Sequence, residues 1–350
     1  MAKGNKHVLD DFRALLKALS SEDNPEVRDI ISQDAEDKLS YAFKGDNFKD
    51  VQKERVDVII FTVVEIEHTV LNEILKFDDG VKAPYDNINN KKIWKISIKR
   101  ASGNDLNVLI SQIGEAGPVK SSITCLRVFQ KYDCDLALLI GIAAGNPQSI
   151  SKYDVIVAEA VIDYEPQRLE PKNKIEYRSI PYMLRPTALL NFFKFNFITQ
   201  TSQNRWRERF KMHFEELRLR EPFKSKLSEY EDKMKLKMAD ELTSVKIKVG
   251  LVGSGNKLIA DPQILPTLKM NIGVLRGIEA AEMEAAGFCP ACEEYELKWI
   301  MFRGISDYGG KDKNTVNKKV QWVAALSAVT GALEYLSFDY KTPLDNISDF

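Results

Sequence analysis

Six short, nearly continuous apolar runs punctuate residues 56–307. They are VDVIIFTVV (56–64), NVLISQIG (107–114), DLALLIGIAAG (135–145), DVIVAEAVID (154–163), KIKVGLVGSG (246–255) and KWIMFRGISD (298–307). Such runs, rich in β-branched residues, are typical of strands buried on both faces of a sheet. Segments with helical spacing alternate with them, at 68–77, 118–132, 282–297 and 320–336. The alternation predicts one α/β domain over residues 55–337, with a three-layer arrangement of a mixed, mostly parallel sheet flanked by helices.

The first 50 residues depart from this pattern. Phe12, Leu15, Leu16 and Leu19 recur at helical spacing, and Asn24-Pro25 marks a break before a second short helix. We expect residues 1–50 to form a small helical segment. It is either a separate module that binds a protein partner or a cap on the main body.

Residues 165–245 also interrupt the alternation. Residues 166–245 carry 17 Lys and Arg against 11 Asp and Glu, and their middle part is helical in composition. We therefore expect a charged helical insertion in the α/β domain. One interpretation is a solvated helical layer; the other is a lid whose basic side chains meet an anionic substrate.

Composition narrows the class of protein. Of 350 residues, 44% are hydrophobic and 29% are charged, as in globular domains, and the net charge of −1 does not favour a general nucleic-acid-binding surface. The apolar runs are shorter than the roughly 20 residues that span a bilayer, and the start lacks the apolar core of a signal peptide. Four Cys and three His are few for a disulfide scaffold or a His-based metal site. A cytoplasmic protein is expected.

Several common chemical motifs are missing from the sequence. GLVGSG (250–255) does not match GxGxxG, and there is no GxxxxGK[ST], GxSxG or HExxH. Cys289 and Cys292 form a single CxxC with no second pair at zinc-site spacing, so buried thiols are the simpler interpretation. We expect neither a metal nor a cofactor.

Carboxylates remain, and they follow predicted strands. Glu65 and Glu67 follow the first strand, Glu282 and Glu284 lie in AAEMEAAG, and Asp307 ends the last strand. Taken singly, each is simply an acid at a helix start or in a solvated turn. Ligands of open α/β sheets collect at the carboxyl ends of the strands. Together with the small-residue turn GIAAGNP (141–147), these acids therefore predict a pocket with several carboxylates.

The motifs also carry a resemblance. VVEIEHTVLNEIL, GIAAGN, DVIVAEAVIDYE, VGSGNKLIAD, AAEMEAAG and FRGISDYGG occur in the order seen in the nucleoside phosphorylase superfamily. They look most like its hydrolytic branch, which includes the 5′-methylthioadenosine/S-adenosylhomocysteine nucleosidases. The resemblance covers residues 55–337 without the insertion. EMEAAG and RGISD are specific motifs, whereas GIAAG and the first strand are weaker alone.

This resemblance implies a role for residues on both sides of an N-ribosidic bond. Cleavage develops positive charge on the ribose, and the purine leaves more easily when N7 is protonated. Asp307 matches the acid that donates this proton, with Ser306 orienting it. Glu67 matches the residue that activates the attacking water, and Arg303 matches the residue that helps fix that water. A shift of register by two would place Glu65 there instead.

The same resemblance implies the residues that bind the substrate. Glu284 matches the residue that binds the ribose hydroxyls, and Met283 packs on the sugar. Leu258 and Ile259 match the segment that lines the base pocket. The family's small polar residue is missing from GIAAG, so Ala143 and its turn would contribute only their backbone.

Hydrolysis is favoured over phosphorolysis, because GIAAGNP contains no Arg for an attacking phosphate. Arg168 and Arg178, in the basic insertion, suit a 5′-phosphate. Family members with extra N-terminal modules resemble bacterial antiviral effectors that remove the base from ATP. We therefore predict a purine nucleotide N-ribohydrolase acting on adenine nucleotides such as ATP. Alternatives are a 5′-methylthioadenosine/S-adenosylhomocysteine nucleosidase, a purine nucleoside phosphorylase, or a nucleotide-binding sensor or assembly subunit. The resemblance also implies a homo-oligomer.

Overall fold

The computed structural model describes residues 53–80, 84–100, 103–170, 174–228, 238, 240–257, 259, 261, 264–265, 277–309 and 320–337. The predicted helical segment 1–50 lies outside these residues, as does Leu258. The fold below is that of the unit that begins at Lys53.

A ten-stranded sheet forms the centre of this unit, in the order β11-β10-β6-β12-β5-β1-β4-β3-β2, with β9 paired to β6. Its strands are β1 (Glu54–Thr62), β2 (Asp86–Ile88), β3 (Lys91–Lys99), β4 (Asp105–Gln112), β5 (Tyr132–Gly145), β6 (Val155–Asp163), β9 (Ile180–Met183), β10 (Ile247–Ser254), β11 (Ala280–Glu282) and β12 (Lys298–Asp307). The pairs β4–β1, β1–β5, β5–β12, β6–β10 and β10–β11 are parallel. All six predicted apolar runs contain a strand, and the predicted α/β class is confirmed.

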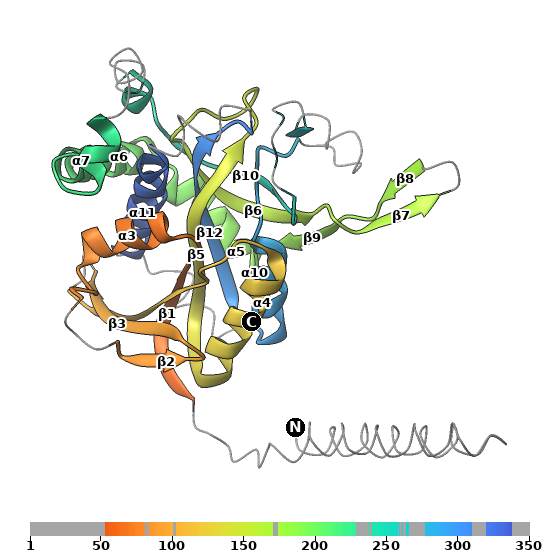
Figure 1. Cartoon of the computed structure of the whole chain (residues 1–350), viewed down its shortest axis with the longest axis horizontal. Coiled ribbons are helices and arrows are strands. Elements are labelled where there is room, and N and C mark those ends of the chain that lie inside the picture. The colour runs from red at the N-terminus through yellow and green to blue at the C-terminus, as the bar shows by residue number, and fades with distance from the viewer. Residues whose placement is uncertain are drawn as a thin grey trace. The chain divides into compact units, whose positions relative to one another are not determined.

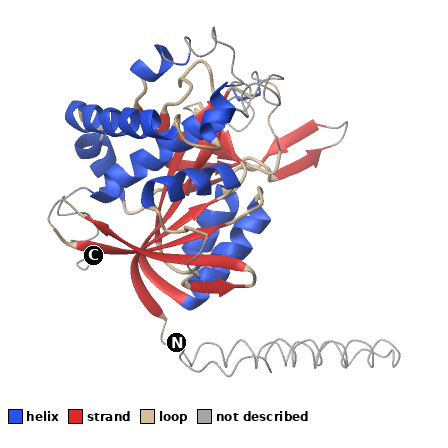
Figure 2. Cartoon of the chain, turned by 60° about the vertical axis from the view of Figure 1, so that its left-hand side comes forward, coloured by secondary structure: helices blue, strands red, loops and turns tan. Residues whose placement is uncertain are grey.

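Helices cover both faces of the sheet (Figure 2). The described helices are α3 (Glu65–Leu75), α4 (Pro118–Lys131), α5 (Thr187–Phe192), the π-helical turn η2 (Phe193–Phe197), α6 (Gln200–Leu217), α7 (Phe223–Ser228), α10 (Ala285–Glu294) and α11 (Gln321–Ser337). Helix α4 packs beside α10, and α11 packs beside α3 and α6. None of the helices in the described part of the chain combines the length and apolar character that crossing a membrane requires.

A short antiparallel pairing closes part of the sheet on itself. Strand β11 pairs in parallel with β10 and also antiparallel with the end of β5, where Ala280 lies opposite Gly145 and Ala281 opposite Ala144. Strands β5, β12, β6, β10 and β11 therefore form a ring. The ends of β5, β11 and β12 meet at one rim, which brings residues far apart in the sequence close together.

The expected helical insertion contains α5, η2, α6 and α7, but three short strands precede these helices. Strands β7 (Gln167–Glu170) and β8 (Lys174–Tyr177) form a separate two-stranded ribbon that projects from the sheet (Figure 1). Strand β9 continues the main sheet by pairing with β6. These strands were not predicted because their segments lack the continuous apolar runs of the central strands, and β7 and β8 pair with each other rather than with the main sheet.

Helix α6, the longest described helix of the insertion, is a structural layer rather than a free lid. Its buried residues Trp206, Phe210 and Phe214 follow a spacing of four, which makes one apolar stripe. Phe214 stacks on Trp322 of α11 at 5.4 Å between ring centroids, with an interplanar angle of 8°. Arg205 on α6 pairs with the buried Glu334 of α11 at 2.5 Å. The helix thus directs its aromatic stripe and this Arg towards the core helix.

The close contact between α4 and α10 predicts that a side chain at Gly287 lowers the stability of the protein. A Cβ atom on Gly287 of α10 would lie 1.8 Å from the backbone oxygen of Pro118, which cannot move without shifting α4. We expect Gly287→Ala to lower the free energy of unfolding by about 1–3 kcal/mol, as overpacking does. The measurement is chemical denaturation followed by circular dichroism.

Gly331 of α11 is the matched control, because the nearest atom to a Cβ there is 3.5 Å away, an ordinary contact. Gly331→Ala should be neutral or stabilising by up to about 1 kcal/mol, owing to the better helix propensity of Ala. Equal effects of the two substitutions would contradict this account of the α4–α10 contact.

Candidate active site

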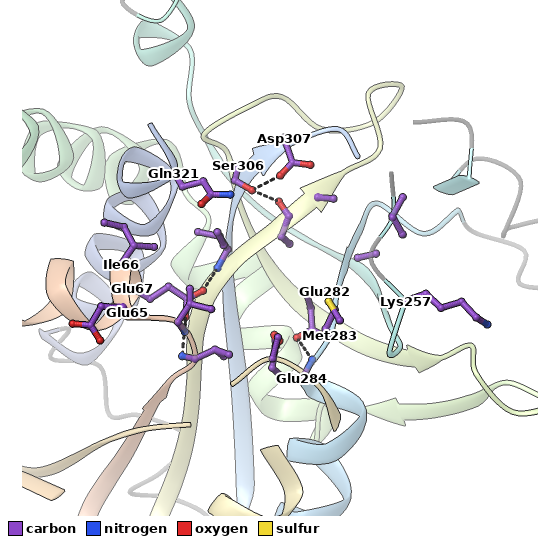
Figure 3. Close-up of a pocket in the computed structure, with 18 of the residues that line it drawn as sticks. Glu65, Ile66, Glu67, Lys257, Glu282, Met283, Glu284, Ser306, Asp307 and Gln321 are labelled. Carbon is purple, nitrogen blue, oxygen red and sulfur yellow. Dashed lines mark hydrogen bonds between the residues drawn. The ribbon is translucent and has the colours of Figure 1, made fainter. Parts of the chain in front are cut away.

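The rim of the closed strands borders a cavity of about 360 Å³. Figure 3 shows its walls, which come from the end of β1 and the start of α3, the end of β5, the β11–α10 junction and the end of β12. Five carboxylates line it, namely Glu65, Glu67, Glu282, Glu284 and Asp307. The structure therefore brings together, in one cavity, acids that lie up to 242 positions apart in the sequence (307 − 65 = 242).

Glu67 is held by backbone N–H groups. Helix α3 begins three residues after β1 ends, so the side chain of Glu67 turns back over the first turn of the helix. Its Oε2 accepts hydrogen bonds from the N–H groups of Val63 at 2.7 Å and Val64 at 3.0 Å. Its Oε1 accepts one from Ile142 at 2.8 Å. Glu67 is 2% exposed, whereas the neighbouring Glu65 is exposed at the rim.

The GIAAG turn provides the space that Glu67 requires. A Cβ on Gly141 would lie 2.1 Å from Nη1 of Arg303 and 2.5 Å from Oε1 of Glu67. Only a residue without a side chain at position 141 therefore lets the carboxylate of Glu67 and the guanidinium of Arg303 approach each other beside β5. The turn contributes the N–H of Ile142 rather than a hydroxyl, in keeping with the backbone role expected for it.

Arg303 is the fully buried centre of the site. Its Nη2 donates to Glu282 Oε2 and to Glu284 Oε2, the latter at 3.1 Å. Its Nη1 lies 4.0 Å from Oε1 of Glu67. Neither Nη1 nor Nε has a hydrogen-bond partner among the described residues. A buried donor without a partner is costly, and a water that accepts from Nη1 and donates to Glu67 would supply that partner.

Asp307 lies on another wall, at the end of β12, and is 2% exposed. The Ser306 hydroxyl lies 2.7 Å from its Oδ2 and 3.3 Å from the carbonyl oxygen of Ala143, so it can donate to one of them at a time. The N–H of Gly309 donates to Oδ1 at 2.8 Å. These contacts fix the carboxyl group in one orientation in the cavity (Figure 3).

Burial shifts the proton affinities of this cluster. It raises the pKa of Glu67 above its usual value, although Arg303 and the backbone donors oppose this change. Burial, followed by the charge of Glu282, raises the pKa of Glu284 to about 8. Burial disfavours the charged form of Arg303, but the surrounding carboxylates outweigh it and raise the pKa of the guanidinium. Among the described residues, no group of three or more His, Cys, Asp or Glu side chains is placed to hold a metal ion.

The remaining expected site residues divide into three groups. Met283, Ile259 and Ala143 line the same cavity, and Leu258 lies outside the described residues. Arg168 and Arg178 do not line it. They belong to the β7–β8 ribbon and its end, are exposed, and approach Glu176 at 3.9 and 3.7 Å. The sequence placed them near the cavity because they follow a strand end, but the ribbon carries them away from it (Figure 1).

Three polar residues that line the cavity, Tyr164, Lys257 and Gln321, were not expected there from the sequence, and Glu282 was expected only as one of its several carboxylates. Glu282, Tyr164 and Lys257 lie within the motifs AAEMEAAG, DYE and VGSGNKLIAD, so their position beside strand ends was the available signal. Nothing in the sequence around Gln321 indicates its place, because it reaches the cavity through the packing of α11.

Comparison with known proteins places the chain in a family. The profile of the phosphorylase superfamily matches residues 58–333. The chain is 25% identical over 279 residues to the ATP nucleosidase Cap17 of Escherichia coli (strain KTE188), covering 79% of this chain and 51% of that protein. It is 21% identical over 220 residues to the 5′-methylthioadenosine/S-adenosylhomocysteine nucleosidase of Geobacillus sp. (strain WCH70), covering 63% and 75%. The chain thus spans about half the length of the Cap17 relative.

Solved structures show the same fold. The 5′-methylthioadenosine/S-adenosylhomocysteine nucleosidase of Neisseria meningitidis, in complex with methylthio-immucillin-A, superposes with a TM-score of 0.53 at 14% identity, covering 80% of this chain and 98% of that one. Futalosine hydrolase of Helicobacter pylori strain 26695 gives a TM-score of 0.52 at 14% identity, covering 81% and 98%. The matched profile extends over most of the described domain and over every motif around the cavity, and the chain therefore belongs to the phosphorylase superfamily.

Proposed function

We propose that this protein hydrolyses the N-glycosidic bond of a purine nucleoside or nucleotide. The observation that carries the proposal is the arrangement of buried groups around one cavity. Glu67, Glu284 and Asp307 line this cavity from different elements (Figure 3). The buried Arg303 donates to Glu284 and lies 4.0 Å from Glu67. This matches the two-sided chemistry of glycoside cleavage, which needs an acid beside the leaving group and a base beside water.

In the proposed reaction, Asp307 donates a proton to N7 of the purine while the bond from C1′ of the ribose to N9 breaks. Glu67 removes a proton from a water molecule whose oxygen forms the new bond to C1′. The free Nη1 of Arg303, 4.0 Å from Glu67, orients that water. Glu284 accepts hydrogen bonds from the ribose hydroxyls. The products are the free purine and the ribose or ribose phosphate.

Water rather than phosphate is the proposed nucleophile. The space beside Glu67 is bordered by Glu282 and Glu284 as well, and Arg303 already donates to both of those acids. Several carboxylates would repel a phosphate dianion there, and the one guanidinium that could attract it is already shared by two of them. A neutral water meets no such repulsion.

Adenine nucleotides such as ATP are the proposed substrates. The Cap17 relative is named an ATP nucleosidase, and the shorter relatives act on methylthioadenosine by name. Arg168 and Arg178 lie away from the cavity, so we assign the 5′-phosphate contact to Lys257, the exposed cation that lines it and pairs with Glu165 at 2.9 Å. An antiviral role is the biological setting that we infer for such an activity.

The test is release of free adenine. Purified full-length protein is incubated with ATP, AMP, adenosine and methylthioadenosine, and the products are separated by chromatography. We expect adenine from ATP or AMP, and a loss of roughly 100- to 10,000-fold in kcat for Asp307→Asn and for Glu67→Gln, as removal of an acid or base produces.

Glu65→Gln is the matched control, since Glu65 lies two residues away but is exposed at the rim, and it should retain most of the activity. Release from methylthioadenosine alone would overturn the nucleotide assignment. Binding of ATP without turnover, unchanged in Asp307→Asn, would instead identify a nucleotide-binding sensor.

We also propose that the chain forms a homo-oligomer through α4. Val119 and Ile123, one turn apart on this helix, are 70% and 39% exposed. The preceding Ala116 lines the cavity, so an interface here would adjoin the site.

We expect size-exclusion chromatography with light scattering to give a dimer or larger species for the wild type, and a smaller mass for the double variant Val119→Glu, Ile123→Glu. Met212→Glu, on the exposed face of α6, is the control. A monomeric wild type would contradict the proposal.

The raised pKa of Glu284 predicts a pH-dependent cost in stability. Its pKa rises from 4.5 to about 8 on folding, so the folded protein holds this proton more tightly than the unfolded chain. The resulting stabilisation is complete below about pH 4.5 and is lost as the pH rises towards about 8. The glutamine in Glu284→Gln stays neutral at every pH. The melting temperature of this variant, relative to that of the wild type, should therefore rise between about pH 5 and pH 8.

Differential scanning fluorimetry at several pH values measures this gain. Glu294→Gln, which makes the same change at an exposed position of helix α10, is the control variant. A constant difference for Glu284→Gln would show that Glu284 is ionised in the free protein.

A further inference from the structure

We propose that Glu282 is a positioning residue of this site. It holds the guanidinium of Arg303 and the first turn of α10, and its charge controls whether Glu284 accepts hydrogen bonds from ribose. The last part rests on the proposed function, whereas the first two parts concern the protein alone.

Glu282 fixes the backbone that carries Glu284. It is the last residue of β11, and its carboxylate accepts hydrogen bonds from the N–H groups of Glu284 at 3.0 Å and Ala285 at 3.0 and 3.1 Å. The next N–H, of Ala286, donates to the hydroxyl of Ser254 at 2.8 Å. Side chains at the ends of β10 and β11 therefore accept hydrogen bonds from the free N–H groups in the first turn of α10. The helix dipole also favours an anion at this position.

The same carboxylate orients Arg303. Nη2 of Arg303 donates to both Glu282 and Glu284, and the guanidinium is fully buried. This double contact points Nη1 towards Glu67, where water is proposed to bind. If Glu282 were neutral, Glu284 would be the remaining direct charge partner of Arg303, and the guanidinium would turn towards it.

Charge connects Glu282 to Glu284. The groups that face Glu284 are Glu282 from β11, Arg303 from β12 and Glu67 from α3, so three buried carboxylates share one guanidinium. Burial raises the pKa of Tyr164 and of Cys289, and the charge of Glu282 adds to the rise in both, after that of Glu165 in the case of Tyr164. Next to burial, Glu282 is the main cause that raises the pKa of Glu284. A protonated carboxyl group has less acceptor capacity, so accepting hydrogen bonds from two ribose hydroxyls favours the ionised form of Glu284.

The decisive variant is Glu282→Gln, which keeps an acceptor oxygen for α10 and removes the charge. The titration of Glu284 is followed in the free, full-length protein by carbon-13 NMR of labelled Glu carboxyl groups, with Glu284→Gln identifying its signal. We expect the midpoint to fall by about one pH unit or more, as loss of a like charge in contact produces. An unchanged midpoint overturns the proposal. Glu294→Gln should leave it unchanged.

Kinetics separate positioning from a merely structural role. For adenine release, Glu282→Gln should lower kcat by roughly 10-fold or more, since Arg303 loses its orientation. The pH at which KM reaches its low plateau should move down together with the Glu284 midpoint. Reduced activity with an unshifted KM profile would overturn the proposal.

A second variant, Glu282→Asp, keeps the proposal testable if Glu282→Gln does not fold. Glu282→Asp keeps the charge but withdraws it by one methylene, so the Glu284 midpoint should stay high while kcat falls. Wild-type kcat in this variant overturns the positioning role. If the wild type releases no purine from any substrate, the proposed function fails, yet the NMR titration still tests Glu282. If purine is released and the midpoint does not move, the function stands and this inference fails.

Discussion

The balance between one buried guanidinium and three buried carboxylates is the interaction on which the site depends. Arg303 has no access to solvent, and burying its charge is favourable only because Glu282 and Glu284 accept its hydrogen bonds and Glu67 lies 4.0 Å away. Burial raises the pKa of Glu67 although Arg303 opposes this change, and burial followed by the charge of Glu282 raises the pKa of Glu284. The removal of these groups from solvent, together with their crowding around one guanidinium, therefore sets the charge state of the site.

The closed strands make this balance possible. Arg303 projects from β12, Glu282 ends β11, and Gly141 on β5 leaves room for the guanidinium beside Glu67. Pairing of β11 with both β10 and β5 holds these strand ends at one rim. A rigid scaffold of this kind keeps partly satisfied polar groups in place, so that a ligand rather than a rearrangement completes their hydrogen bonds.

The charged insertion shows how composition and packing can disagree. Helix α6 is rich in charged residues, yet one stripe of aromatic side chains is buried against α11, and Arg205 pairs with the buried Glu334. The β7–β8 ribbon takes Arg168 and Arg178 away from the cavity. A net basic charge therefore did not identify a phosphate site, because the position of each cation depends on the element that carries it.

Apolar periodicity and placement at a strand end are local properties, so they were sufficient to predict the α/β class, the main strands and helices, and the acids that follow them. Leu258 and residues 1–50 lie outside the described residues, so those predictions stand untested. The sequence also predicted that Glu67, Glu284 and Asp307 border one pocket, whereas the contact of Arg303 with Glu282 became evident from the three-dimensional structure. Strands β7 to β9 were not predicted because their charged segment lacks the apolar runs of the central strands. The ring closed by β11 was not predicted because its pairing joins residues as far apart in the sequence as Ala280 and Gly145.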